Sequence, residues 1–194
     1  MNLRTVLFVL GILLSILGIA MLLPAIFQFY IGENSGNFLT SSFITIFVGV
    51  LLILSNLYTE KRLNLREAFI LTTSSWVGIA LFGSFPFFFS NLEMSFSDSF
   101  FESMSGITTT GSTVITDLDI APKGILMWRA LLQWLGGIGI IVMAITILPF
   151  LGVGGMQLFQ IQSASASEKI LPKTKEISFK IFYIYSSLTF FCFI

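Results

Sequence analysis

Long apolar runs constrain this chain more than any other feature. A helix needs about 20 mostly apolar residues to cross a bilayer. Four runs reach that length, at Val6 to Tyr30, Phe38 to Tyr58, Ala68 to Phe89 and Ile125 to Leu151, and a fifth begins near Ile177. Hydrophobic residues make up 55% of the chain and charged residues 10%, against about 25% charged in soluble domains. We therefore predict an all-α integral membrane protein.

The two ends of the sequence each carry an apolar run. The run that follows Arg4 is longer than the roughly 7–15 residues of a signal-peptide core and lacks an A-x-A-like cleavage site, so we predict an uncleaved first transmembrane helix. The last run is still apolar at Ile194. We therefore expect an amino-terminal fragment that is truncated inside a helix.

Positive charges in short loops predict which side of the membrane each loop occupies. The basic residues beside the apolar runs are Arg4, Lys61, Arg62, Arg66, Lys169, Lys173, Lys175 and Lys180. We place them in the cytoplasm, together with the amino terminus. The opposite loops carry Glu33, Glu93, Asp117 and Asp119, with Lys123 as the exception. For the spans to alternate, residues 92–123 must enter and leave on the outer side, so we predict a re-entrant loop there.

A short polar segment lies inside that loop, at Phe100 to Thr116, with the sequence FFESMSGITTTGSTVIT. Just before it, Ser95 and Ser99 each precede an acidic residue by three positions, the pattern of a helix start. A helix from about Ser97 to Gly106 would be on the order of 15 Å long, half of a roughly 30 Å hydrocarbon core. Its carboxyl end would point at the membrane centre, where its partial negative charge favours a cation.

Threonines surround one glycine after this helix. β-branched threonines favour extended backbone, whereas Gly111 can adopt a positive φ that lets successive carbonyls face one axis. Such carbonyls can replace the hydration shell of an ion such as potassium. A side chain at position 111 would clash or turn a carbonyl away. We predict a cation filter, with an ordinary polar turn as the alternative.

The motif GITTTGST resembles the pore loop of the Trk/Ktr/HKT superfamily of potassium transporters. The preceding FFESMSG is similar to the pore helix of this family. Residues 128–160, WRALLQWLGGIGIIVMAITILPFLGVGGMQLFQ, are similar to the second membrane helix of the first repeat in its bacterial TrkH branch. The resemblance implies that the backbone carbonyls of four residues bind potassium. These are Thr109, Thr110, Gly111 and Ser112.

The resemblance also implies a division of the chain into repeats. In this family one polypeptide carries four helix, pore-loop, helix repeats of the potassium-channel type, and the TrkH branch adds two helices before them. Residues 1–62 would form that extra helix pair and 63–155 the first repeat. Residues 156–176 would form a cytoplasmic linker, and 177–194 the start of a truncated second repeat. The chain would then supply one of four filter loops.

Five residues around the loop are expected to support it: Asp98, Glu102, Thr108, Thr113 and Arg129. Asp98 could attract cations or simply cap the helix. A buried Glu102 needs a donor, because an unpaired carboxylate in the membrane is costly. Arg129 could pair with Glu102 or with Asp117, or extend to the outer interface instead. The glycines of the GGIGI segment allow close helix contact.

The activity implied by the resemblance is potassium uptake across a bacterial cytoplasmic (inner) membrane, with potassium as the transported substrate and no organic cofactor. It leaves open whether the protein is a channel or a proton- or sodium-coupled symporter. It also implies a homodimer of the full-length protein in membrane lipid. The inner surface would contact a cytosolic, nucleotide-binding regulatory subunit of the TrkA type.

Other classes of function have less support. The net charge is zero, so no basic surface favours nucleic acid. An enzyme is disfavoured because the chain has no histidine, no phosphate-binding loop and no GxSxG motif, and Ser103 or Ser105 would lack a base. A non-transporting membrane scaffold or anchor remains the main alternative, with the threonine loop as a surface turn.

Overall fold

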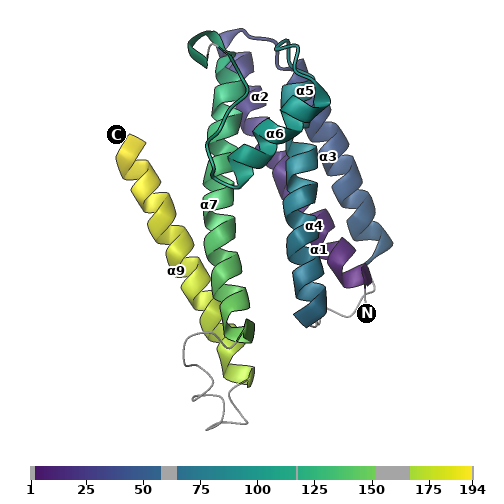
Figure 1. Cartoon of the computed structure of the whole chain (residues 1–194), viewed down its shortest axis with the longest axis vertical. Coiled ribbons are helices and arrows are strands. Elements are labelled where there is room, and N and C mark those ends of the chain that lie inside the picture. Colours follow the sequence, from purple (N-terminus) through teal and green to yellow (C-terminus); the bar gives the residue numbers. More distant parts are fainter. Residues whose placement is uncertain (1–2, 58–64, 117, 152–166, 194) are drawn as a thin grey trace. The chain divides into compact units, whose positions relative to one another are not determined.

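The computed structural model describes residues 3–57, 65–116, 118–151 and 167–193 (Figure 1). Within these ranges every regular element is a helix, which confirms the predicted all-α class. In the described part of the chain, four helical segments are long and apolar enough to cross a membrane: Leu3–Ile31, Gly36–Ser55, Arg66–Phe88 and Lys123–Ile141. They match the four long runs of the sequence.

Prolines interrupt two of these spans. The first span consists of α1 (Leu3–Ala20) and α2 (Leu22–Ile31), with Pro24 just after the break. The third consists of α4 (Leu65–Gly83) and α5 (Phe85–Phe88), with Pro86 in the same relation. Proline has no backbone N–H, so the carbonyl four residues earlier loses its helical partner at each break.

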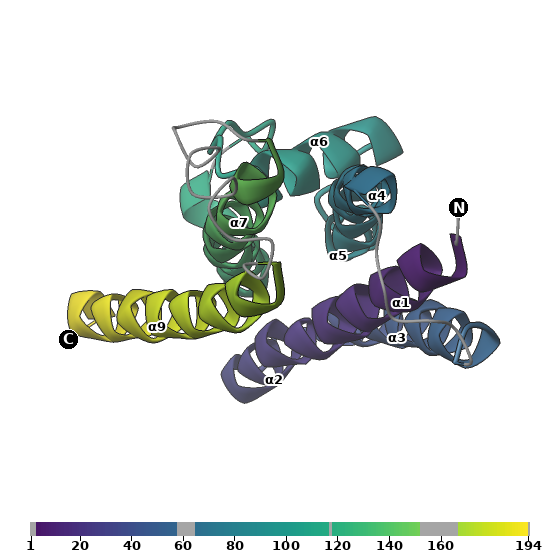
Figure 2. The same cartoon turned by 90° about the horizontal axis from the view of Figure 1, so that it is seen from below.

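The helices divide into two compact units, Met1–Gly136 and Gly137–Ile194. In the first unit, α1 packs along α3 (Gly36–Ser55) and also against α4, as Figure 2 shows from below. The buried apolar side chains form one cluster that includes Leu14, Leu17, Met21, Phe38, Phe87 and Trp128. The rings of Phe38 and Trp128 meet edge to face at 6.3 Å, which joins α3 to the helix after the loop.

The short helix α6 (Phe96–Ile107) lies across the first unit between α4 and the first half of α7 (Lys123–Leu151) (Figure 1). A loop of residues 108–116 and a short 3₁₀ turn, η1 (Leu118–Ile120), lie between α6 and α7 in the sequence. Residue 117, an expected partner of Arg129, lies outside the described residues. The helix, loop, helix order of residues 65–151 thus agrees with the predicted repeat.

The second unit contains the rest of α7 and the helix α9 (Ser167–Phe193). This helix begins earlier than the expected start near Ile177, so residues 167–176, which were expected to belong to a cytoplasmic linker, are helical. The physical reason is that Glu and Lys, frequent between 167 and 177, are good helix formers although they are not apolar. Hydropathy marks the part of a helix that suits lipid and not the whole helix. Residues 152–166 lie outside the described residues.

Candidate pore loop

A capping box starts α6. The Ser95 hydroxyl oxygen accepts the Asp98 backbone N–H at 3.1 Å, and the Asp98 carboxylate accepts the Ser95 N–H at 3.3 Å. Ser99, the other candidate start, lies inside the helix, and its hydroxyl donates to the Ser95 carbonyl at 2.9 Å. Both pairs have the same sequence spacing, so only the structure distinguishes the cap. Asp98 is exposed and serves this cap.

The carboxyl end of α6 turns into the threonine segment through a Schellman motif. The Thr109 N–H donates to the Gly106 carbonyl at 3.0 Å, and the Thr110 N–H to the Ser105 carbonyl at 3.1 Å. Thr109 has a φ of +60° in this motif, where glycine is the usual residue. A left-handed conformation costs a β-branched residue about 1–3 kcal/mol, so the surrounding contacts hold this turn in place.

Gly111 has a φ of +79°, as the sequence predicted it could. A Cβ added at Gly111 would come no closer than 3.9 Å to any neighbour, the amide nitrogen of Gln133. Within the described part of this chain, a side chain at position 111 would therefore meet open space. Only the backbone conformation disfavours substitution, since L-residues rarely adopt this φ.

The segment Thr109–Val114 is exposed to the space beside the loop. Thr108, at the end of the helix, is half-buried, and its hydroxyl donates to the Met104 carbonyl at 2.8 Å. The hydroxyls of Thr108 and Thr110 lie 2.9 Å apart. The predicted filter residues 109–112 therefore form a continuous strip of exposed residues. Among the described residues, no cluster of histidine, cysteine or acidic side chains could bind a metal ion.

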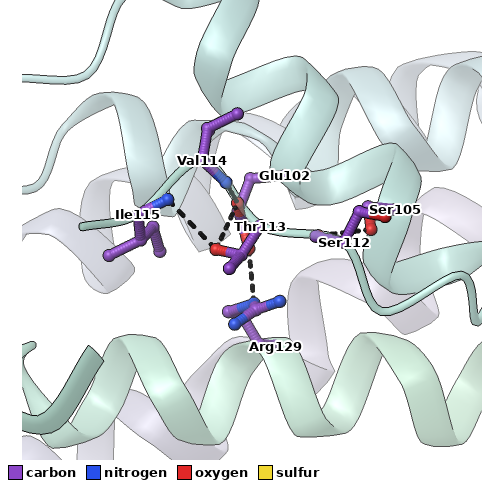
Figure 3. Close-up of polar contacts among 7 residues, drawn as sticks. All are labelled: Glu102, Ser105, Ser112, Thr113, Val114, Ile115 and Arg129. Atoms are coloured by element: carbon purple, nitrogen blue, oxygen red, sulfur yellow. Dashed lines mark hydrogen bonds and ion pairs between the residues drawn. The ribbon is translucent and has the colours of Figure 1, made fainter. Parts of the chain in front are cut away.

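The carboxylate of Glu102 holds the second half of this segment, at Thr113 and Val114, from behind (Figure 3). One oxygen, Oε2, accepts both the Thr113 hydroxyl and the Val114 N–H at 3.0 Å. The other, Oε1, forms an ion pair with Nε of Arg129 on α7. The Glu102 side chain is fully buried and that of Arg129 is 12% exposed, so the pair is shielded from water. The structure thus pairs Arg129 with Glu102, one of its two expected partners, and Asp117, the other, lies outside the described residues.

Ser105, one helical turn after Glu102, contacts the first half of the segment. Its hydroxyl donates to the Ser112 carbonyl at 2.6 Å (Figure 3). Its own carbonyl accepts the N–H of Thr110 at 3.1 Å and that of Gly111 at 3.4 Å. The residues 110–112 are therefore all tied to one position on α6.

Glycines let α6 and α7 approach each other's backbones. A Cβ on Gly136 would overlap the carbonyl of Ile107, and one on Gly106 would lie 3.1 Å from the Cβ of Leu132. On the same side of α7, the indole N–H of Trp128 donates to the Gly83 carbonyl at 2.9 Å. The first half of α7 is thus fixed both to the pore helix and to α4.

The sequence pointed to most of this site but missed Ser105, Val114 and Trp128. The Val114 contact runs through a backbone N–H, which no sequence pattern reveals. A signal for Ser105 existed, because Glu102 and Ser105 are three residues apart and must share one face of α6. A pore helix that offers two polar side chains on one buried face needs partners for both of them.

Known proteins resemble this chain in both sequence and structure. The family model of the TrkH cation transport proteins matches residues 34–194. That match covers most of the chain. The chain belongs to the TrkH family. The crystal structure of the potassium transporter TrkH from Vibrio parahaemolyticus superposes with a TM-score of 0.83 at 36% identity, covering 98% of this chain and 38% of the other.

Two Trk potassium uptake proteins show how far the sequence similarity extends. The Trk system potassium uptake protein TrkH of Vibrio parahaemolyticus is 39% identical in an alignment of 196 positions, which covers 99% of this chain and 40% of the relative. The Trk system potassium uptake protein TrkI of Halomonas elongata is 47% identical over 123 residues, 63% of this chain and 25% of the relative. The chain therefore spans about two fifths of the first relative's length.

Proposed function

We propose that this chain is the first-repeat part of a potassium uptake protein, in which residues 109–112 line one quarter of a selectivity filter. The observation that carries this proposal is a strip of exposed backbone that is held from behind by buried polar groups. The sign of φ alternates along it, from −79° at Thr108 to +60° at Thr109 and, after Thr110, to +79° at Gly111. Such alternation turns successive peptide planes so that their carbonyls share one side.

The depth of the strip suits an ion inside the membrane. Ile107, the last residue of α6, contacts α7 at Gly136. At 1.5 Å per residue, Gly136 lies roughly 20 Å along α7 from its start at Lys123, within a hydrocarbon core of about 30 Å. The carboxyl end of α6, with its partial negative charge, therefore ends inside the membrane beside the strip. That charge favours a cation over an anion.

Selective uptake then follows from coordination rather than from covalent chemistry. A potassium ion that enters the filter exchanges its water for carbonyl oxygens of Thr109, Thr110, Gly111 and Ser112. One loop cannot surround an ion, so three further loops must complete the ring. The same oxygens bind potassium weakly enough to release it on the inner side. Channels and coupled symporters share this step.

We propose the orientation in the membrane and the partners from the family and from the positions of the charged residues. We place the amino terminus and the helix ends that carry Arg4 and Arg66 in the cytoplasm of a bacterium, because positive charge favours that side. The loop then enters from the outer face of the inner membrane. The complete protein would act as a homodimer in lipid, and its inner surface would bind a cytosolic, nucleotide-binding subunit of the TrkA type.

Gly111→Ser in the complete transporter tests the filter. The serine cannot easily keep a φ of +79°, so a carbonyl turns and potassium over sodium selectivity, measured by rubidium and sodium uptake, should fall. Gly32→Ser is the matched control, because Gly32 has a φ of +84° and open space around it but caps α2 instead. If Gly111→Ser keeps the selectivity of the wild type, residues 109–112 are not the filter.

A scaffold without transport is the competing function, and labelling separates the two. With Cys192 and any further cysteine of the complete transporter replaced by serine, Thr110→Cys at this exposed position should react with a membrane-impermeant reagent from outside only. Potassium should protect it, whereas sodium should protect it less. Reaction that no ion affects would favour the scaffold.

A further inference from the structure

Ser105 is a buried residue that belongs to the pore helix and not to the exposed strip. It is 5% exposed and lies in the last turn of α6. Its hydroxyl and its carbonyl together contact three consecutive residues of the strip, Thr110, Gly111 and Ser112. We propose that Ser105 is a positioning residue that sets the direction and spacing of the filter carbonyls, an inference that rests on the proposed function.

The hydroxyl contact is the part of this arrangement that a side chain controls. At 2.6 Å it is a short hydrogen bond, and its acceptor is a carbonyl that the filter uses. A carbonyl oxygen has two lone pairs, so the Ser112 oxygen can accept from Ser105 and still face an ion. The bond therefore fixes the angle of that carbonyl and reduces its freedom to move toward a smaller ion.

The two backbone contacts explain why position 105 suits this task. The Ser105 carbonyl accepts the N–H groups of Thr110 and Gly111, which directs the opposite sides of these peptides away from the helix. The same residue thus holds the backbone on both sides of Gly111. Because these contacts come from the main chain, they persist in every variant at this position, and a substitution removes only the hydroxyl.

Glu102 acts on different atoms of the loop. Its carboxylate holds Thr113 and Val114, beyond the filter residues, and is itself fixed by Arg129. Ser105 needs no charged partner and touches the filter residues directly. Loss of Ser105 should therefore change which ion is preferred, whereas loss of Glu102 should first destabilise the loop.

Ser103 provides a matched control on the same helix. It is fully buried, and its hydroxyl has no hydrogen-bond partner among the described residues. Ser103→Ala and Ser105→Ala thus remove the same atom from the same short helix, but only the second removes a contact with the strip. Any effect of a small void in α6 is common to both variants.

The experiment compares these two variants in the complete transporter, reconstituted in vesicles. We expect Ser105→Ala to lower the ratio of potassium to sodium transport by roughly two- to tenfold, the factor that corresponds to one hydrogen bond. Its KM for potassium should rise more than its maximal rate falls. Ser103→Ala should keep the ratio of the wild type, and Ser105→Thr, which retains a hydroxyl, should restore most of it.

The outcomes separate this inference from the proposed function. If the wild type moves neither ion, both proposals fail. If the wild type selects potassium and Ser105→Ala selects it equally well, only the role of Ser105 is wrong. If Ser105→Ala does not fold, Ser105→Cys replaces it, because a thiol is similar in size but a weaker donor. Equal selectivity of the Cys and Thr variants would then overturn the inference.

Discussion

The α1–α3 pair and the pore loop contain similar small residues but use them differently. In the helix pair, Gly11 and Gly49 allow close approach, since a Cβ on Gly11 would lie 2.7 Å from the Gly49 carbonyl. The hydroxyls there mostly return to their own helix, as that of Ser41 does to Asn37 at 2.6 Å. In the pore loop, the hydroxyl of Ser105 instead crosses to Ser112 in another segment.

The difference shows what each region requires. Two regular helices already satisfy their own backbone groups, so they need only shape complementarity to pack in a membrane. The segment 109–114 has no regular hydrogen bonding, and its course is determined by the groups behind it. Small residues therefore allow close packing of the helices in the first region, whereas in the second they set the course of the backbone. Substitutions should separate stability from ion selectivity accordingly.

The largest effect is expected from Arg129→Gln. The change leaves the carboxylate of Glu102 buried without its cation, and breaking a buried pair in this way costs about 3–5 kcal/mol. We expect a loss of that size in the free energy of unfolding, measured by chemical denaturation in mixed micelles, together with loss of selectivity. Both effects on one variant would mark the pore loop as the region where stability and function coincide.

The double variant Glu102→Gln with Arg129→Gln is the control. Without the buried charge, two neutral amides can still donate and accept, so most of the lost stability should return. If the single and double variants are equally unstable, the charge of Glu102 does not matter and the ion pair is incidental.

An intermediate effect is expected from alanine at the two close helix contacts. Gly136→Ala forces α6 away from α7 at Ile107, and Gly11→Ala forces α1 away from α3 at Gly49. Overpacking of this kind costs roughly 1–3 kcal/mol. Unfolding should show a loss for both variants, whereas rubidium and sodium uptake should show altered selectivity for Gly136→Ala alone.

This pair tests the comparison most directly, because the chemical change is identical in both regions. Unchanged selectivity in Gly136→Ala would mean that the position of the pore helix does not control the filter. Altered selectivity in Gly11→Ala would mean that the α1–α3 pair does more than pack.

The smallest effect is expected from Ser42→Ala. Its hydroxyl donates across the helix pair to the Gly18 carbonyl at 2.7 Å, and such bonds between membrane helices contribute on average about 0.6 kcal/mol. Stability should fall by that amount with selectivity unchanged. Ser41→Ala, which loses only a bond within its own helix, should lie closer to the wild type in the same unfolding measurement.

Much of the fold followed from apolar runs and from local patterns. The four membrane-length helices and the half-length helix between the third and fourth were predicted because lipid requires long apolar helices and because capping residues mark helix starts. The choice of Ser95 over Ser99 was not predictable, since both have the same spacing to an acid. The early start of α9 at Ser167 was missed because hydropathy does not follow helix propensity.

The candidate site was likewise predictable from the sequence only in part. The sequence by itself determined which segment breaks the apolar pattern and that Gly111 can take a positive φ, because these depend on residue type and local sterics. Only the tertiary structure decided that Glu102 meets Arg129 and that Ser105 meets Ser112. These contacts join residues whose approach depends on how α6 packs on α7, and that packing is set by many side chains at once.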